Sequence, residues 1–364
     1  MKKLLAILLA CMMLISMVAL TGCADDDEGA DGVRIALVAH SPESILDDGS
    51  FNAGAHVGIL QFMDAQGIPA ENFQFFQPGE ATDPARIDLI ESAITGFGAD
   101  ILVLPGFHFI SSLYEAQDLF PETKFVLLDA SPAGPGGVRI ANNLVAIHYA
   151  EEESGFLAGY AAVRDGFRNM GFTGGAAVPA VVRFGHGFLQ GADFAAQQLG
   201  LAEGDVTVRF HYFGGFAPDP AHTAFAGAWF ADGVEVIFAA AGGAGASVIA
   251  AADAANAAVI GVDVDQSGDG AVVITSAVKG LAASVYAMLT DFYNGTFRGG
   301  QELMFNAAVD GVGLPMATSR FNTFSQADYD VIFNQLATGA VSVSNSLDFD
   351  SVVAGLTLVT VFPT

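Results

Sequence analysis

The sequence predicts an α/β protein in which parallel strands alternate with helices, and three observations support this. Short apolar runs of four to six residues alternate with helical patterns through about eight units of the chain. The apolar runs are continuous rather than alternating, as in parallel sheets that are covered on both faces. The length of 364 residues favours two domains. Two smaller doubly wound sheets therefore fit the chain better than one large sheet.

The predicted strands share this apolar composition, and they cover residues 34–39, 101–104, 125–129, 170–173, 206–210, 234–239, 259–262 and 272–275. Stretches rich in glycine and proline, near 131–137 and 267–270, are expected to carry the chain from one sheet to the other.

The predicted helices lie between these strands. Ser50 is a favourable N-cap for the first of them, and apolar residues then recur on one face at Phe51, Ala55, Ile59 and Phe62. Pro220 after Asp219 suits the start of another helix. The remaining helices show the same periodicity, at about 84–95, 111–119, 151–163, 181–199, 246–255 and 279–293.

The first 22 residues predict a secretory signal peptide. Two lysines precede an apolar stretch over residues 4–20, and Leu20-Thr21-Gly22-Cys23 follows. This ending resembles a bacterial lipobox, in which the cysteine is acylated and becomes the first residue of the mature protein. We expect an exported protein that is anchored to the cell membrane through a lipid on Cys23, with residues 23–32 as an acidic tether. A transmembrane anchor is the alternative, because the stretch is near the ~17-residue minimum for a spanning helix.

Composition excludes several classes of function. The formal charge is −27, and loss of the two lysines of the signal peptide makes it −29. Such a surface repels nucleic acid and disfavours self-association, so we expect no nucleic-acid partner and a monomer. The only cysteines are Cys11 and Cys23, so the mature chain has no thiol for a disulfide, a metal or catalysis.

Residues that follow the predicted strands form the candidate binding site, because ligands of such sheets lie beyond the carboxyl ends of the strands. After the first strand, Asp47-Asp48-Gly49-Ser50-Phe51-Asn52 places a helix N-terminus beside an aromatic ring. Phe51 is either a core residue or an aromatic platform at the mouth of a cleft. After the seventh strand, Asp263 and Asp265 alternate with valine and so point to opposite sides, one toward a cleft and one toward a hinge.

Three further features follow strands. The run 212–216 places aromatic residues at a strand end, and Gly242-Gly243-Ala244-Gly245 lets a ligand approach the backbone closely. The glycine run matches neither a Walker loop nor G-x-G-x-x-G. Lys279 is one of two lysines after Cys23, and it follows a strand at the predicted start of a helix, which indicates a role in a site.

Neither a metal site nor an active site is predicted. The stretch from Asp263 to Gly268 matches the opening of an EF-hand loop, but Ile274 stands where the bidentate glutamate should be. The seven histidines lack H-x-x-x-H spacing, and no G-x-S-x-G elbow occurs. We expect no cofactor and no enzymatic activity. An exported hydrolase that uses a carboxylate pair such as Asp47 and Asp263 is the alternative.

Several segments together resemble the basic membrane protein family of ABC-transporter substrate-binding lipoproteins, whose best-known members bind purine nucleosides. The matching segments span residues 33 to about 314 in the family's order, and they are Asp48-Gly49-Ser50-Phe51-Asn52, 153–160, 171–175, Pro179, Phe184, Gly187-Phe188, Gly191, 261–266 and 275–279. The resemblance implies a type I periplasmic-binding-protein fold with two Rossmann-like lobes, three crossovers and a hinged cleft. The N-terminal lobe would comprise 33–145 and about 277–306, and the C-terminal lobe 146–276 and about 307–364.

The resemblance also implies roles for individual residues. Phe51 would stack on the base, with Phe213 or Phe184 of the other lobe on the opposite side. Asp263 resembles the carboxylate that accepts both ribose hydroxyls, and Lys279 the lysine that also reaches the ribose. The remaining residues expected to bind ligand are Asp48, Asn52, Asp129, which would read the base edge, and Gly243. The expected partners are a purine nucleoside and the permease and ATPase subunits of an ABC importer.

The chain departs from the family in two places that bear on base selectivity. Asp47-Asp48 stands where members often carry Asn-Asp before the Ser-Phe-Asn run. Family members usually carry Thr-Asp after the first strand, and Ala39-His40 stands here. A polar acceptor that faces the base is therefore missing or replaced. This departure leaves a sugar or a signalling molecule as an alternative ligand on the same fold.

Overall fold

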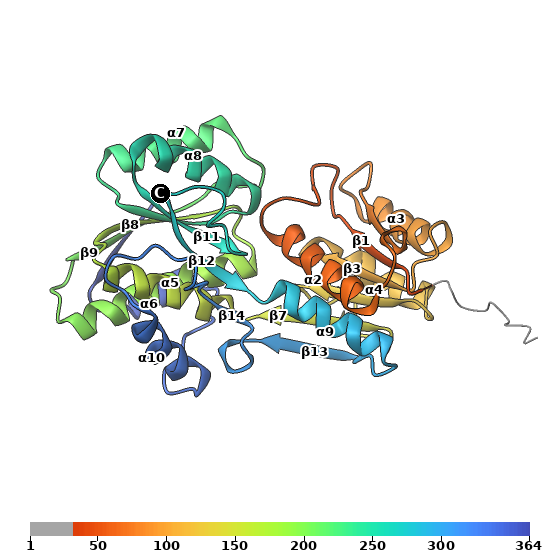
Figure 1. Ribbon diagram of the computed structural model, residues 1–364. Coiled ribbons are helices and arrows are strands. Elements are labelled where there is room, and N and C mark those ends of the chain that lie inside the picture. Colours follow the sequence, from red (N-terminus) through yellow and green to blue (C-terminus); the bar gives the residue numbers. More distant parts are fainter. Residues whose placement is uncertain (1–31) are drawn as a thin grey trace, which may run out of the picture.

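Two lobes, each built around one parallel sheet, make up the computed structural model, which describes residues 32–364 (Figure 1). Cys23, the predicted signal peptide and all of the predicted tether except residue 32 lie outside the described residues. Within residues 32–364, no helix is both long enough and apolar enough to cross a bilayer. Figure 1 shows the lobes side by side, joined by the segments that leave β7, β12 and β13.

The first lobe holds a six-stranded sheet in the order β13-β7-β4-β3-β1-β2, and every neighbouring pair is parallel. The strands are β1 (Ile35–Val38), β2 (Phe73–Phe76), β3 (Ile101–Pro105), β4 (Lys124–Leu128), β7 (Leu144–Tyr149) and β13 (Gln301–Phe305). The helices are α2 (Phe51–Gln66), α3 (Asp83–Thr95), α4 (Ile110–Leu119) and α9 (Leu281–Tyr293).

Helices cover this sheet on both faces, as the apolar strands predicted. Alternate residues of β1 belong to two different core clusters: Ile35 packs in the cluster that includes α2 and α9, and Ala36 in the cluster that includes α3 and α4. Successive side chains of a strand point to opposite faces. Both faces are therefore buried, which is why the strand carries no polar residue.

The second lobe holds a seven-stranded sheet in the order β14-β12-β11-β10-β8-β9-β15, in which only β14 is antiparallel. The strands are β8 (Asn169–Gly174), β9 (Val206–Tyr212), β10 (Val236–Ala240), β11 (Ala258–Asp263), β12 (Val273–Lys279), β14 (Val312–Gly313) and β15 (Val359–Pro363). The helices are α5 (Glu151–Asp165), α6 (Pro179–Leu199), α7 (Pro220–Ala231), α8 (Gly245–Ala255), α10 (Gln326–Ala337) and α11 (Phe349–Ala354).

Glycines bring α5 and α6 into backbone contact. A Cβ at Gly155 or Gly159 of α5 would collide with a carbonyl oxygen of α6, and a Cβ at Gly187 or Gly191 of α6 would collide with a carbonyl oxygen of α5. Small residues at such a contact allow two helices to approach closely. The glycines of the matching segments in α5 and α6 therefore serve helix packing.

The chain passes from one sheet to the other after β7, after β12 and after β13. The prediction that it crosses near 131–137 and 267–270 was wrong. The first stretch contains the small antiparallel pair β5 (Ala133–Gly134) and β6 (Gly137–Val138), and the second joins β11 to β12 within one sheet. Glycine and proline mark tight turns, and here these turns lie within a lobe rather than between lobes.

Candidate functional site

Lys279 lies where the carboxyl ends of strands from both lobes meet. It is the last residue of β12, and its Nζ donates to Asp129 Oδ2 at 2.5 Å, just after β4 in the first lobe. Asp263 Oδ1, at the end of β11, lies 3.4 Å from the same Nζ, and Glu151 Oε1 lies 3.5 Å from it. Only 3% of the lysine side chain is exposed. A buried ammonium requires such partners, because burial without them is strongly unfavourable.

The prediction that Lys279 begins a helix was wrong, because β12 extends four residues beyond its predicted end and α9 begins at Leu281. The predicted strand ended at Thr275, but Ser276 and Ala277 continue the pairing with β11. The side chain therefore projects from a strand end, where its position is set by the sheet.

Three aromatic rings surround the ammonium of Lys279. The ring centroids of Phe51, Phe184 and Tyr149 lie 4.7, 5.4 and 5.5 Å from Nζ. Phe51 opens α2 in the first lobe, and Phe184 lies on α6 in the second. Attraction between a cation and a ring face adds to the pairing with carboxylates. The structure thus brings five of the predicted site residues together: Phe51, Asp129, Phe184, Asp263 and Lys279.

Two of the carboxylates on Lys279 have an unusual backbone conformation. Asp129 has φ 61° and Asp263 has φ 66°, both in the left-handed region. The other non-glycine residues with positive φ among residues 32–364, Asn256 and Asp310, follow the ends of helices, where this conformation is common. A strained residue in a strand-end loop costs of order 1–3 kcal/mol and tends to occur at functional sites. The strain therefore singles out the same two aspartates as the geometry.

Burial changes the protonation of this cluster. It raises the pKa of Asp129 to about 7, a shift that Lys279 opposes and that Glu151 and Asp263 reinforce. Burial works against the charged form of Lys279, but the three carboxylates outweigh it and hold the lysine pKa above its ordinary value. Within residues 32–364, Asp129 Oδ1 has no hydrogen-bond partner. Asp129 therefore has a buried carboxylate oxygen without a partner among the described residues, at the junction of the lobes.

The N-terminus of α2 is capped by Asp48, which was predicted to bind ligand. Its carboxylate accepts from the backbone N–H groups of Ser50, Asn52 and Ala53 at 2.9–3.0 Å. The side chain of Asn52 donates to Ile45 O at 3.0 Å. Both predicted ligand residues thus hold the loop that carries Phe51. Ser50 occupies the N-cap position, but its hydroxyl does not cap the helix, because Asp48 already serves those N–H groups.

Phe213 lies apart from the rings around Lys279. Its ring stacks on His222 with centroids 4.1 Å apart and packs edge-on against Phe225. Gly243 lies in a short 3-10 turn directly after β10, at the carboxyl end of the sheet. Both residues follow strands, as the sequence predicts. The sequence alone does not show whether the ring of Phe213 faces the other lobe.

Phe216 closes the aromatic run 212–216 that the sequence places at a strand end, but it was not assigned to the ligand. A Cβ at Gly175 would overlap its ring, and a Cβ at Gly242 would lie 3.3 Å from it. Its carbonyl oxygen accepts from Ala244 N at 2.7 Å. The ring therefore lies over the loops that follow β8 and β10. The glycines after both strands were the available signal, because they leave room for a ring.

His40 stands where the resemblance predicts a carboxylate. Its ring stacks on that of His108, with centroids 4.1 Å apart and planes within 1°. Burial lowers the pKa of both histidines to about 4, and the nearby Arg86 guanidinium acts in the same direction. The imidazoles are therefore neutral near pH 7, and each offers one donor and one acceptor.

The side chains of Asp263 and Asp265 contact different groups, as their alternation along the strand predicts. Asp265 accepts from Thr318 Oγ1 at 2.6 Å and from Ser267 N at 3.0 Å, whereas Asp263 faces Lys279. No group of three or more histidine, cysteine or carboxylate side chains is arranged to hold a metal ion in the part of the chain that the structure describes.

A family model described as "ABC transporter substrate-binding protein PnrA-like" matches residues 33–344. The chain belongs to this family. It is 27% identical to the ABC transporter nucleoside-binding protein BmpA of Lactococcus lactis, over 91% of this chain and 97% of that protein. It is 26% identical to Basic membrane protein B of Borrelia garinii, over 82% of this chain and 86% of that protein. The protein is thus an ABC transporter substrate-binding protein of the Bmp family.

Solved structures share the fold. A solute-binding protein of an ABC transporter system from Aeropyrum pernix superposes with a TM-score of 0.74 at 20% identity, covering 88% of this chain and 96% of that one. Another from Conexibacter woesei superposes with a TM-score of 0.68 at 22% identity, covering 86% and 99%. The predicted type I periplasmic-binding-protein fold is confirmed.

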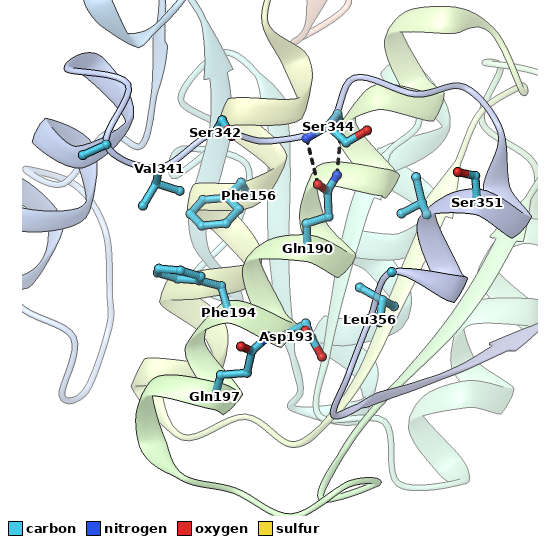
Figure 2. Close-up of a pocket in the computed structure, with 13 residues that line it drawn as sticks. Phe156, Gln190, Asp193, Phe194, Gln197, Val341, Ser342, Ser344, Ser351 and Leu356 are labelled. Carbon is cyan, nitrogen blue, oxygen red and sulfur yellow. Dashed lines mark hydrogen bonds between the residues drawn. The ribbon is translucent and has the colours of Figure 1, made fainter.

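The C-terminal segment from residue 340 onward is held against α6, and its part after residue 344 lies beyond the matched region. Gln190 bonds the backbone of Ser344 in both directions, and Asp193 accepts from the backbone N–H groups of residues 357–359. A cavity of about 410 Å³ lies beneath this segment, beside Phe156 and Phe194 (Figure 2). It shares no lining residue with the Lys279 cluster, and its amide and carboxylate groups already have partners. We therefore assign the cavity no part in the site.

Proposed function

We propose that the protein captures a purine nucleoside between its lobes and delivers it to an ABC importer. The observation that carries this proposal is the cluster to which both lobes contribute, in which an aromatic ring, an ammonium and two strained carboxylates lie together. A nucleoside offers a flat base for the ring and a diol for the charged groups. The printed name of the Lactococcus lactis relative, a nucleoside-binding protein, supports the same ligand class.

Phe51 is the proposed platform for the base. Stacking of a base on an aromatic side chain contributes about 1–3 kcal/mol and tolerates different bases. For the opposite face we favour Phe216 over Phe213, because the ring of Phe216 lies over the loops that follow β8 and β10, whereas Phe213 packs against His222 and Phe225. Phe184 is only 2% exposed, so we assign it to the wall behind Lys279 rather than to the ligand.

The charged groups suit the sugar and the base edge. Asp263 would accept from the ribose hydroxyls and Lys279 would donate to them, in charge-assisted hydrogen bonds that are stronger than neutral ones. The free Oδ1 of Asp129 would accept from an N–H group of the base. An anionic ligand is disfavoured, because the carboxylates of Asp129, Asp263, Glu151 and Glu152 outnumber the cations Lys279 and Arg183 around the site.

The N-terminal sequence supports an extracytoplasmic location with a lipid anchor on Cys23, and the family supports permease and ATPase subunits as partners. The hydrolase alternative is disfavoured by the same geometry. Asp47 is exposed, whereas Asp263 accepts from Ser50 and faces Lys279, so the two do not form a paired acid and base.

Calorimetry of the full chain in detergent against adenosine, guanosine, inosine and ribose tests the proposal. We expect micromolar or tighter binding of at least one nucleoside and weaker binding of ribose. Phe51→Ala should reduce the free energy of binding by about 1–3 kcal/mol and Asp263→Ala by about 1.5–3 kcal/mol. Phe213→Ala and Asp265→Ala are matched controls that should leave affinity unchanged. Tighter binding of ribose than of any nucleoside would favour the sugar alternative and contradict the proposal.

A further inference from the structure

The hydroxyl of Ser50, in the first lobe, forms a hydrogen bond to a residue of the second lobe. Its Oγ donates to Asp263 Oδ2 at 2.7 Å, and the serine is fully buried. A serine at an N-cap position normally accepts from the N–H groups of its own helix. Here Asp48 accepts from those groups instead. The hydroxyl is therefore free to donate to a carboxylate 213 residues away in the sequence.

A second bond joins the same two segments. Gln266 Nε2 donates to Gly49 O at 3.0 Å, and Gln266 Oε1 accepts from Val262 N at 2.8 Å within its own lobe. Gln266 is itself buried. The loop before α2 is thus held at two consecutive residues, 49 and 50, by the last residue of β11 and by the loop that follows it. Phe51 comes directly after these residues, so its position relative to Asp263 depends on them.

The Ser50 hydrogen bond also orients the Asp263 carboxylate. Oδ2 accepts from Ser50, and Oδ1 faces Lys279 at 3.4 Å. A carboxylate oxygen has more than one lone pair, so each oxygen can still accept from a ligand. Among the described residues of the first lobe, Ser50 is the one that donates to Oδ2 of Asp263. Removing its hydroxyl would therefore also remove one of the contacts that hold the strained backbone at Asp263.

We propose that Ser50 is a positioning residue for the sugar end of the ligand, and this inference rests on the proposed function. Its hydroxyl holds the acceptor for the ligand hydroxyls at a set position relative to the ring of Phe51, although the two groups belong to different lobes. Ser50 therefore selects for ligands that carry both a flat ring and a diol, because it fixes how far apart these two features must lie.

The test compares two ligands on the full chain in detergent by calorimetry: the nucleoside that wild type binds most tightly among adenosine, guanosine and inosine, and its 2′,3′-dideoxy analogue. Ser50→Ala should weaken the nucleoside by about tenfold, the effect of one hydrogen bond to a charged group, and the analogue by less than about twofold. Ser50→Cys fills the same space with a weak donor and should give the same pattern if the alanine variant fails to fold. Ser112→Ala is the control, because Ser112 is equally buried in the same lobe and bonds only Phe109 O.

The outcomes separate the two proposals. If wild type binds neither ligand, the proposed function fails. If wild type binds the nucleoside but Ser50→Ala and Ser50→Cys weaken both ligands equally, or neither, then Ser50 only supports the fold and the inference is overturned. In a protein that already carries Asp263→Asn, Ser50→Ala should no longer weaken the nucleoside more than the analogue, because the acceptor that Ser50 positions is then changed.

Discussion

Replacing Lys279 with methionine removes the ammonium that the buried carboxylates share and keeps a side chain of similar length. Asp129, Asp263 and Glu151 would then lie together without their common partner. Removing one member of a buried ion pair typically costs about 3–5 kcal/mol, because the remaining charge stays buried and unpaired. We expect the variant to lose this much of its free energy of unfolding at about pH 8.5, above the pKa of Asp129.

The cost should fall as the pH falls. Burial already raises the pKa of Asp129 to about 7 in the folded state, against an ordinary value of 3.8, and loss of Lys279 should raise it further. A folded state that binds a proton more tightly than the unfolded state gains stability as the pH falls toward the ordinary pKa, by up to about 1.4 kcal/mol per pH unit for each proton. The difference between variant and wild type should therefore be smaller at about pH 5.5 than at about pH 8.5.

Urea unfolding followed by tryptophan fluorescence measures this effect, because Trp229 is the sole tryptophan, is 4% exposed and lies in the second lobe with Lys279. Lys124→Met, which changes the other lysine of the described chain at the start of β4, is the control and should cost little. Adding Asp129→Asn to the Lys279→Met variant should restore part of the lost stability at high pH. Equal stability losses at both pH values, or no loss at either, would refute the reasoning.

Three further predictions concern stability and can be checked by the same unfolding assay. Gly191→Ala should destabilise the protein by about 1–3 kcal/mol, because the added methyl group would meet the carbonyl of Phe156. Gly227→Ala should instead stabilise α7 by about 0.5–1 kcal/mol, since nothing lies within 4 Å of its Cβ position. A larger loss of stability at Gly227 than at Gly191 would contradict the packing of α5 on α6. Asp48→Ala should lower the free energy of unfolding by about 0.5–2 kcal/mol, as loss of a helix cap usually does. An unchanged midpoint of urea unfolding would show that the loop before α2 does not depend on Asp48. Burial raises the pKa of Glu152 from 4.5 to about 7. The contribution of this group to stability is therefore present below pH 4.5 and is lost as the pH rises through 7. Glu152→Gln should make the free energy of unfolding depend less steeply on pH in that window, and a dependence as steep as that of wild type would rule this out.

The elements that the sequence predicted are the central ones. All eight predicted strands occur, because residues buried on both faces must be apolar whatever their neighbours. The strands that were missed lie mainly at sheet edges. β2 and β13 carry polar residues and are partly exposed, and β15 ends in an exposed segment. β7 is the exception, since it is apolar and lies inside the sheet only because β13 pairs with its outer side.

The site could be predicted in part. Phe51, Asp263 and Lys279 were singled out because they follow predicted strands, a position that predicts the carboxyl edge of a parallel sheet, and the structure brings them together. Asp48 was assigned to the ligand, whereas in the structure it caps α2. Glu151 was not singled out, and Phe216 was noted in the aromatic run 212–216 but not assigned to the ligand. A glutamate in the first turn of a helix is common in any protein, and nothing in the local pattern distinguishes one that also faces a lysine.

The sequence by itself determined which segments become buried strands and helices, because burial and backbone capping act on residues close together in the chain. Only the tertiary structure decided which strand ends face one another. Asp129 and Lys279 are 150 residues apart, and Ser50 and Asp263 are 213 apart, yet both pairs form hydrogen bonds. These contacts depend on the strand order and on three crossings between the lobes, and neither leaves a periodic signal in the residues themselves.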